Sequence, residues 1–151
     1  MSDLIEFERR GAIAVLRINR PDVRNAFDRA TAQAMEAALD LFDADAELRV
    51  GVLTGAGAAF SAGQDLKAAA RGEFAQTERR GGFGIMAQPP KKPLIAAVEG
   101  AALAGGFELA LACDLIVASS DSHFGLPEVK RSLVAVGGGA LRLPHAAPPH
   151  I

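Results

Sequence analysis

The long apolar segment of residues 92–119, KPLIAAVEGAALAGGFELALACDLIVAS, constrains the fold more than any other part of this sequence. Its two ends, residues 93–100 and 114–119, are short runs rich in large apolar residues, which predicts strands. The alanine-rich residues 103–112 between them are helical in composition, apart from their glycines. A strand, a helix and a strand at this spacing are typical of βαβ units, so the sequence predicts an α/β fold.

Glu108 stands inside this apolar segment, where an unpaired buried carboxylate would cost roughly several kcal/mol. If a helix begins near Gly105, its first amides have no partner within the helix and, with the helix dipole, favour negative charge. Glu108 lies three residues further on and shares a face with Gly105. Two interpretations stay open. The site holds an oxyanion donor beside a carboxylate, or Glu108 only complements the dipole while Gly105 and Gly106 allow close packing.

Composition and charge disfavour several classes of protein. The chain has 151 residues, half of them apolar, which suits one domain with a substantial core. A net charge of −2 argues against a nucleic-acid or membrane partner, and no clean apolar run is long enough to span a bilayer. The single Cys113 cannot form an internal disulfide and the N-terminus lacks a signal sequence, so we expect a cytoplasmic protein. The histidines lie at no metal-ligand spacing, so no metal site is expected.

Further elements are predicted from hydrophobic periodicity and turn residues. Residues 4–9 and 12–19 predict a β-hairpin that turns at a glycine, and residues 49–55 predict a short buried strand. Asp28 is a candidate N-cap for a helix over residues 29–43. The apolar positions of this helix recur at helical spacing and are expected to face the core: Ala34, Met35, Ala38, Leu39 and Phe42.

Two segments between these elements carry mainly small or charged residues. The stretch GAGAAFSAGQD invites comparison with a dinucleotide-binding loop, but phenylalanine stands where that fingerprint needs its third glycine. It is therefore either a plain turn that ends a strand or a place where the backbone approaches a ligand closely. Residues 68–90 are charged, glycine-rich and without a clear apolar face, so we expect a mobile helix or loop there.

The stretch SHFGLPEVK holds a second candidate glutamate. Pro127 fixes the backbone just before Glu128, and Gly125 permits a tight turn. A glutamate held in this way is either a positioned acid or base, or a solvated residue of a loop or of a first helical turn.

Taken in order along the chain, four stretches resemble a single family. NRPDVRNAF, GAGAAFSAGQDL, KPLIAAVEGAALAGGFELALACDLIVAS and FGLPEVK together are similar to the enoyl-CoA hydratase/isomerase family, the crotonases. The resemblance runs from about residue 5 to about residue 144, and the joint pattern is highly specific. It implies an α/β fold in which repeated ββα units form a crotonase-like spiral. Residues 1–144 would be the core domain, and residues 145–151 a short proline-rich tail.

The resemblance also implies roles for individual residues. In the family two backbone amides polarise a thioester carbonyl, and the matching donors here are Ala62 and Gly105. Glu108 and Glu128 match the two glutamates of members that hydrate a 2-enoyl thioester: Glu108 would orient and deprotonate water, and Glu128 would supply the proton at C2. Residues implied to contact the substrate or its CoA portion are Arg24, Ala26, Ala62, Gly63, Gln64, Asp65, Leu66 and Gly105. Lys67 is either a phosphate contact or a solvated side chain.

The implied reaction is the reversible hydration of a 2-enoyl-CoA to a 3-hydroxyacyl-CoA, with acyl-CoA as substrate and no further cofactor. One alternative is another crotonase reaction, such as that of an enoyl-CoA isomerase or a carnitinyl-CoA-type dehydratase. A second is a non-catalytic protein that binds CoA or assembles with other chains. Members of the family continue with helices that close the acyl pocket and build a trimer. The C-terminal helical part is therefore expected to be missing, and the core to assemble as a homotrimer or hexamer.

The sequence departs from the family pattern in its last part. Ser132 stands where the family commonly has glycine, so strain or a different turn is expected there. The chain has VAVGGGALRLP where a proline-initiated glycine loop is usual, and His145 follows where arginine is usual. The final stretch PHAAPPHI is expected not to be helical, because of its prolines.

Overall fold

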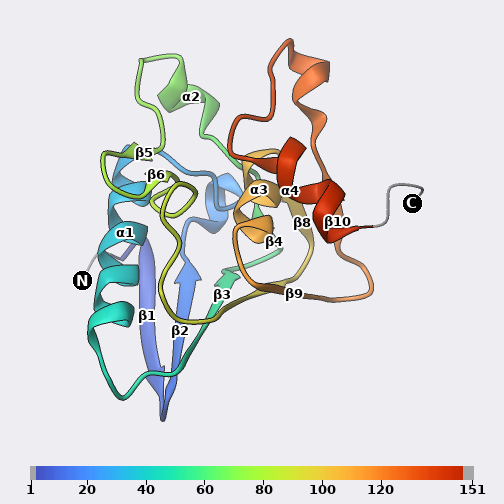
Figure 1. Ribbon diagram of the computed structural model, residues 1–151. Helices are drawn as coiled ribbons and strands as arrows, with labels where there is room; N and C mark the ends of the chain where they lie inside the picture. The colour runs from blue at the N-terminus through green and yellow to red at the C-terminus, as the bar shows by residue number, and fades with distance from the viewer. Residues whose placement is uncertain (1–2, 148–151) are drawn as a thin grey trace.

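The computed structural model describes residues 3–147. Its largest sheet has five strands (Figure 1). Its strand order is β1-β2-β3-β7-β9, in which β1 and β2 are antiparallel and each later pair is parallel. The five strands are β1 (Ile5–Arg10), β2 (Ile13–Ile18), β3 (Val50–Gly55), β7 (Leu94–Val98) and β9 (Leu115–Ala118). The sequence predicts each of these five strands to within a few residues.

A second sheet of three parallel strands, in the order β10-β8-β4, takes one strand from each later unit of the chain. Its strands are β4 (Ala59–Ser61), β8 (Ala101–Leu103) and β10 (His123–Gly125). The helical elements are η1 (Pro21–Val23), α1 (Arg29–Ala44), α2 (Leu66–Ala69), α3 (Gly105–Leu111), η2 (Pro127–Arg131) and α4 (Gly139–Ala146). Three successive units therefore place one strand in each of the two sheets before a helical turn: β3-β4-α2, β7-β8-α3 and β9-β10-η2. The predicted series of ββα units is confirmed.

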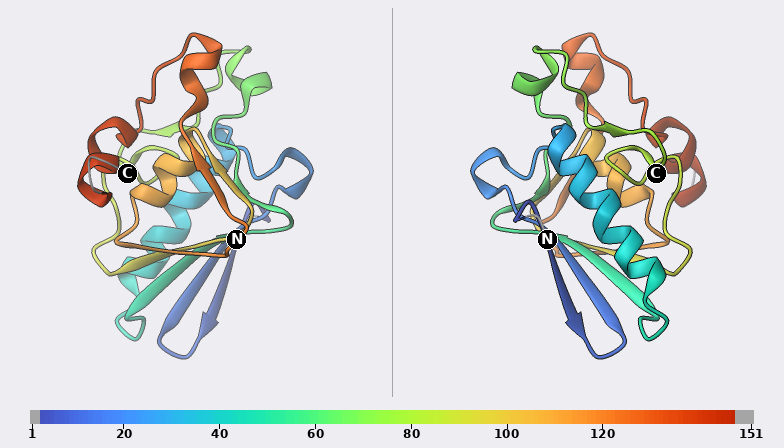
Figure 2. Two further views of the ribbon diagram at one scale, coloured as in Figure 1. Left: turned by 90° about the vertical axis from the view of Figure 1, so that its right-hand side faces the viewer. Right: turned by 90° about the vertical axis from the view of Figure 1, so that its left-hand side faces the viewer.

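The first unit shows why these residues form these elements. Gly11 closes the hairpin between β1 and β2 with a φ of +61°, which glycine adopts without strain. Asp28 caps α1, because its Oδ1 accepts a hydrogen bond from the Thr31 amide at 2.8 Å. α1 lies along the sheet (Figure 2) and buries the predicted apolar face, with Ala34 half-buried. The fully covered positions of that face are Met35, Ala38, Leu39 and Phe42.

The segment between α2 and β7 is held to α1 by a buried arginine that the sequence analysis did not single out. Arg80 is 2% exposed. Its Nη2 donates to Asp40 Oδ1 at 2.8 Å and to Asp43 Oδ2 at 2.9 Å, and its Nη1 donates to the Gln88 carbonyl at 2.9 Å. A buried guanidinium that is paired in this way ties the segment to α1, since the Arg80 cation without its carboxylate partners would be a costly buried charge.

The same segment also contributes to the core. Its only regular structure is the two-stranded pair β5 (Gln76–Thr77) and β6 (Gly81–Gly82). Phe83 is 6% exposed and stacks on Phe27, with the ring centroids 4.6 Å apart. Ile85 is fully buried. Phe83 and Ile85 lie among glycines and charged residues and continue no helical or strand period, which is why the sequence shows no clear apolar face here.

The last helix extends further than the sequence predicts. α4 continues through Pro144 to Ala146, where PHAAPPHI was expected not to be helical. Proline removes its own hydrogen bond and crowds the carbonyl four residues earlier, but the hydrogen bonds on either side of Pro144 persist. Arg142 N still donates to the Gly138 carbonyl at 2.8 Å, and Ala147 N donates to the Leu143 carbonyl at 3.0 Å. Residues 148–151 of the predicted tail lie outside the described residues.

Within residues 3–147, large apolar side chains are exposed in several places, including β9 and the segment between η2 and α4. On β9, at the edge of the main sheet, Leu115 and Val117 are each 62% exposed. The segment between η2 and α4 exposes Val134 and Val136 to 77% and 90%. No helix within residues 3–147 is long and apolar enough to cross a membrane.

Candidate active site

A cleft with a volume of about 1150 Å³ lies between the loop after β4, the turns around β6, the start of α3, and η2. Its rim includes α2 and η2, which project from the same end of the molecule (Figures 1 and 2). The residues of the sequence prediction that line this cleft are Arg24, Ala62, Gln64, Leu66, Gly105, Glu108 and Glu128. The structure therefore brings together residues from four separate stretches of the chain.

Three predicted substrate contacts do not line the cleft: Ala26, Gly63 and Asp65. Ala26 is 8% exposed, and its carbonyl accepts a hydrogen bond from Arg20. Asp65 caps α2, with Oδ1 accepting from the amides of Lys67 and Ala68 at 3.0 and 3.1 Å. The structure does not support Ala26 and Asp65 as ligand contacts, because both are already engaged within the chain. Lys67 also lies outside the lining.

The amide of Gly105 is available at the cleft. Gly105 is the first residue of α3, so its N–H has no acceptor within the helix. Residues 3–147 provide it with no other hydrogen-bond acceptor. A Cβ on Gly63, whose φ is +88°, would lie 2.8 Å from this nitrogen. Glycine at position 63 therefore keeps the space beside the Gly105 amide open.

The predicted second donor, Ala62, is not supported by the structure. Its N–H donates to the carbonyl oxygen of Arg24 at 2.9 Å. Because this hydrogen bond occupies the amide, Ala62 has no free donor for a substrate oxygen.

Gln64, two residues further on, has an unoccupied amide. A parallel bridge joins Gln64 and Phe27, in which Phe27 N donates to the Gly63 carbonyl and Asp65 N to the Phe27 carbonyl, both at 2.8 Å. These two hydrogen bonds lie on the side of the segment that faces Phe27, so the N–H of Gln64 points away from Phe27. Within the described part of the chain that N–H has no hydrogen-bond acceptor. Gln64 and Gly105 therefore each bring a free amide to the cleft.

Ala104, directly before α3, has a strained backbone. Its φ of +51° and ψ of −128° place it in a region that suits glycine and not residues with a side chain. Its carbonyl accepts hydrogen bonds from the amides of Phe107 at 2.9 Å and Glu108 at 3.1 Å, which start the helix. The strain therefore lies at the residue that orients the Gly105 amide.

Replacing Ala104 with glycine is expected to raise the free energy of unfolding by about 1 kcal/mol. Relief of strain of about 1–3 kcal/mol exceeds the extra chain entropy of glycine, about 0.5–1 kcal/mol. Thermal unfolding measures the difference. Ala101→Gly, in strand β8, is the matched control and should lower stability. An Ala104→Gly chain that melts at or below the parent temperature would contradict the assignment of strain.

Glu108 is 4% exposed and lies in the first turn of α3. Burial is the strongest influence on its pKa and raises it. The Gly139 amide, which donates to Oε1 at 2.8 Å, lowers the pKa, and the nearby Glu128 carboxylate raises it. The Gly137 amide and the Arg142 cation lower it further, but the net pKa stays above the ordinary value. Glu108 is thus a buried carboxyl group suited to exchange a proton.

A turn of three successive glycines encloses the Glu108 carboxylate. A Cβ on Gly137 would lie 2.7 Å from Glu108 Oε2, and a Cβ on Gly139 would lie 2.9 Å from Glu108 Cγ. Gly138 has a φ of +99°, which again favours glycine. The sequence analysis noted VAVGGGALRLP only as a departure and missed this role. The signal available was the run of three glycines itself.

Glu128 approaches the cleft from η2, whose first turn begins at Pro127. The side chain is half-buried, and its Oε2 is a buried oxygen that has no hydrogen-bond partner within residues 3–147. A buried polar atom without a partner is costly and is uncommon in folded proteins. Its position on the cleft, near enough to Glu108 to raise that residue's pKa, suits an oxygen that meets water or substrate.

The turn after η2 shows the strain expected at Ser132. Ser132 has a φ of +56° and a ψ of +34°, in the left-handed region where a side chain is disfavoured. Its amide donates to the Val129 carbonyl at 3.3 Å, and Leu133 N donates to the Glu128 carbonyl at 3.0 Å. These hydrogen bonds close η2 without glycine.

Comparison with known proteins gives a consistent result. The model of the enoyl-CoA hydratase/isomerase family matches residues 8–151. A carnitinyl-CoA dehydratase from Salmonella enteritidis is 46% identical over 155 residues, covering all of this chain and 59% of that protein. The chain therefore spans about 59% of the length of the curated relatives it matches.

Solved structures are similar over the same extent. Enoyl-CoA hydratase EchA1 from Mycobacterium marinum is 58% identical with a TM-score of 0.93, covering 97% of this chain and 58% of that one. A carnitinyl-CoA dehydratase from Mycobacterium avium is 46% identical with a TM-score of 0.93, covering 99% of this chain and 60% of that one. The predicted crotonase-like fold is confirmed. From the family match, the fold and the paired glutamates on one cleft, we conclude that the chain belongs to the enoyl-CoA hydratase/isomerase family.

Proposed function

We propose that the cleft catalyses the reversible hydration of a 2-enoyl-CoA thioester to a 3-hydroxyacyl-CoA. One observation carries the proposal: two carboxyl groups, Glu108 and Glu128, face the same cleft as the free amide of Gly105. Addition of water to a double bond needs a group that takes a proton and one that gives a proton. Solved relatives named enoyl-CoA hydratase support the same reaction class.

The two free amides would stabilise the charge that develops during the reaction. Attack of water on C3 of a conjugated enoyl thioester moves an electron pair onto the thioester oxygen. Amides of Gly105 and Gln64 that face this oxygen would bind the enolate more tightly than the neutral substrate. One such donor typically contributes about 10²–10³ in rate. In this proposal Gln64 takes the place that the sequence assigned to Ala62.

The two glutamates would handle the protons. Glu108, whose Oε1 accepts a hydrogen bond from the Gly139 amide, orients the water and takes its proton as oxygen bonds to C3. Glu128 in its protonated form, with the unpartnered Oε2, gives a proton to C2 as the thioester carbonyl reforms. The roles are reversed in dehydration. Because the carboxyl groups interact, their protons are exchanged by the pair and not by two independent sites.

The rim and walls of the cleft suit a CoA thioester with an apolar acyl group. Arg24 and Arg131 are exposed cations on the lining, and such cations bind phosphate. Among the described residues that line the cleft, Glu108 and Glu128 are the only carboxylates. A quaternary ammonium on the acyl group, as in carnitinyl-CoA, would find no further anionic partner there. We therefore propose an uncharged acyl chain as substrate.

The test is an absorbance assay on the chain as it is. Loss of the conjugated enoyl-thioester absorbance of 2-butenoyl-CoA should follow addition of the chain. The γ-trimethylammonium analogue should show a lower kcat/KM, and a 3-enoyl-CoA should show no double-bond shift. Binding of the CoA thioester without turnover would contradict the proposal and favour a non-catalytic CoA-binding protein. Faster isomerisation than hydration would favour an isomerase.

We propose that the chain self-associates, as a trimer or a hexamer. The exposed apolar side chains of β9 and of residues 133–136 support this, because soluble monomers rarely leave large apolar patches in water. Light scattering at micromolar concentration should give a mass above that of one chain, 15.6 kDa. A monodisperse monomer would contradict the expectation.

A further inference from the structure

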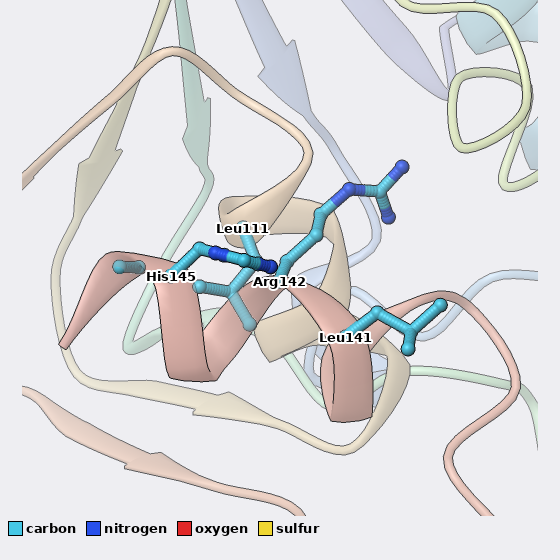
Figure 3. Close-up of a pocket in the computed structure, with 5 residues that line it drawn as sticks. Leu111, Leu141, Arg142 and His145 are labelled. Carbon is cyan, nitrogen blue, oxygen red and sulfur yellow. The ribbon is translucent and has the colours of Figure 1, made fainter. Parts of the chain in front are cut away.

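A single side chain holds the glycine turn that encloses Glu108. Arg142, in α4, extends away from its helix and from His145 (Figure 3). Its Nη1 donates to the Gly137 carbonyl at 2.7 Å, and its Nη2 donates to the Met86 carbonyl at 2.9 Å. One guanidinium therefore joins the glycine turn to the segment after β6.

The residues around this contact are closely packed. A side chain at Gly138 would collide with Arg142 Nη1. A side chain at Gly137 would lie 2.5 Å from Met86 Sδ and 2.7 Å from Glu108 Oε2. Gly137, Met86 and the Glu108 carboxylate are thus packed against one another, and Arg142 bonds to the backbone of two of the three.

We propose that Arg142 is a positioning residue for hydration: it fixes the glycine turn so that the Gly139 amide, which donates to Glu108 Oε1, holds the carboxylate toward the reacting water. This inference rests on the proposed function. Arg142 is not placed on the reacting atoms, and it acts through Glu108. The planar guanidinium has donors on separate nitrogens, which can reach two carbonyls at fixed positions at once. A lysine ammonium is one point of charge on a flexible stem and cannot reproduce that geometry.

Loss of Arg142 should change the pH dependence of the reaction. The charged groups that face Glu108 are Glu128 of η2 and Arg142 of α4. Glu128 raises the pKa of Glu108, whereas Arg142 and the two glycine amides lower it. Loss of the guanidinium removes one cation and loosens both amides, so the pKa of Glu108 should rise. Because the base acts only when deprotonated, the acidic limb of the rate profile should move to higher pH.

The experiment compares the parent chain with Arg142→Gln and Arg142→Lys. The glutamine variant should lose about 10–100-fold in kcat, the scale expected when a reacting group is misplaced by about 1 Å, with little change in KM. The lysine variant, which keeps the positive charge but not the planar guanidinium with its separate donors, should have an intermediate kcat. Arg10→Met is the matched control, because Arg10 is an exposed arginine that pairs with Glu8 at 2.7 Å. It should behave like the parent.

A second readout does not depend on turnover. The carboxyl carbon of Glu108, labelled with ¹³C and assigned with Glu108→Gln, reports its pKa by NMR. This pKa should be higher in Arg142→Gln than in the parent, and intermediate in Arg142→Lys. If the parent does not hydrate enoyl-CoA, the proposed function fails, and the titration still decides the role of Arg142.

Two results would overturn the inference. One is a folded Arg142→Gln chain, checked by circular dichroism, with the parent kcat and the parent Glu108 titration. The second result applies if the glutamine variant does not fold. A folded Arg142→Lys chain with the parent kcat and the parent Glu108 titration would then show that the two separate donors of the guanidinium are not required.

Discussion

Replacing Glu108 with glutamine is expected to lower kcat for enoyl-CoA hydration by about 10²–10⁴, the usual contribution of a general acid or base. Glutamine keeps the size of the side chain and can still accept the hydrogen bond from Gly139, but it cannot take a proton from water. Glu128→Gln should have a loss of similar size, because its unpartnered oxygen would no longer carry a proton. Binding of the CoA thioester should change little in either variant.

The matched control for both variants is Glu99→Gln. Glu99 is exposed and lies outside the cleft lining, so the rate should stay at the parent value. The rate is measured at saturating substrate and the affinity by competition with a non-reacting acyl-CoA. A Glu128→Gln chain that turns over 2-butenoyl-CoA at the parent rate would remove Glu128 from the mechanism.

Replacing Gln64 with proline is expected to lower kcat by about 10²–10³ relative to Gln64→Ala, because proline removes the backbone N–H. Alanine is the reference because both variants lose the side-chain bonds of Gln64. In the parent, Nε2 donates to the Asp65 carbonyl at 3.1 Å, and Oε1 accepts from Ala75 N at 3.0 Å. The ratio of the two kcat values therefore removes the contribution of the Gln64 side chain from the comparison.

A binding measurement keeps this prediction independent of folding defects in the proline variant. When an enolate-like acyl-CoA analogue binds, the amide proton resonances of Gln64 and Gly105 should shift downfield. The amide of Ala62, already bonded to the Arg24 carbonyl, should move little. A shift at Ala62 without one at Gln64 would return the donor role to the residue that the sequence resemblance implied.

The main sheet and α1 could be predicted from sequence because their signals are local. Strands β1, β2, β3, β7 and β9 each carry a local run of β-branched or large apolar residues, and Asp28 marks the start of α1. The second sheet could not be predicted in the same way. Its strands are three residues long, too short for a periodic pattern. Their place is set by pairing partners far along the chain.

The candidate site was predicted in part for similar reasons. Both glutamates and Gly105 stand out in sequence, since each departs from its apolar surroundings. The choice between Ala62 and Gln64 depends on which amide the neighbouring strand already uses, and only the fold shows that Arg24 takes the Ala62 amide. Arg142 contacts carbonyls five and 56 residues away. A role defined by such contacts leaves no pattern in the sequence.

The most direct test of the central claim, that this chain adds water to an enoyl-CoA through Glu108 and Glu128, is isotope incorporation. The chain is incubated with 2-butenoyl-CoA in ¹⁸O-labelled water, and the products are identified by mass spectrometry. The account predicts 3-hydroxybutanoyl-CoA with one ¹⁸O atom in its hydroxyl group, formed by the parent and nearly absent with Glu108→Gln. Bound but unchanged 2-butenoyl-CoA with the parent chain, or equal labelling with Glu108→Gln, would contradict it.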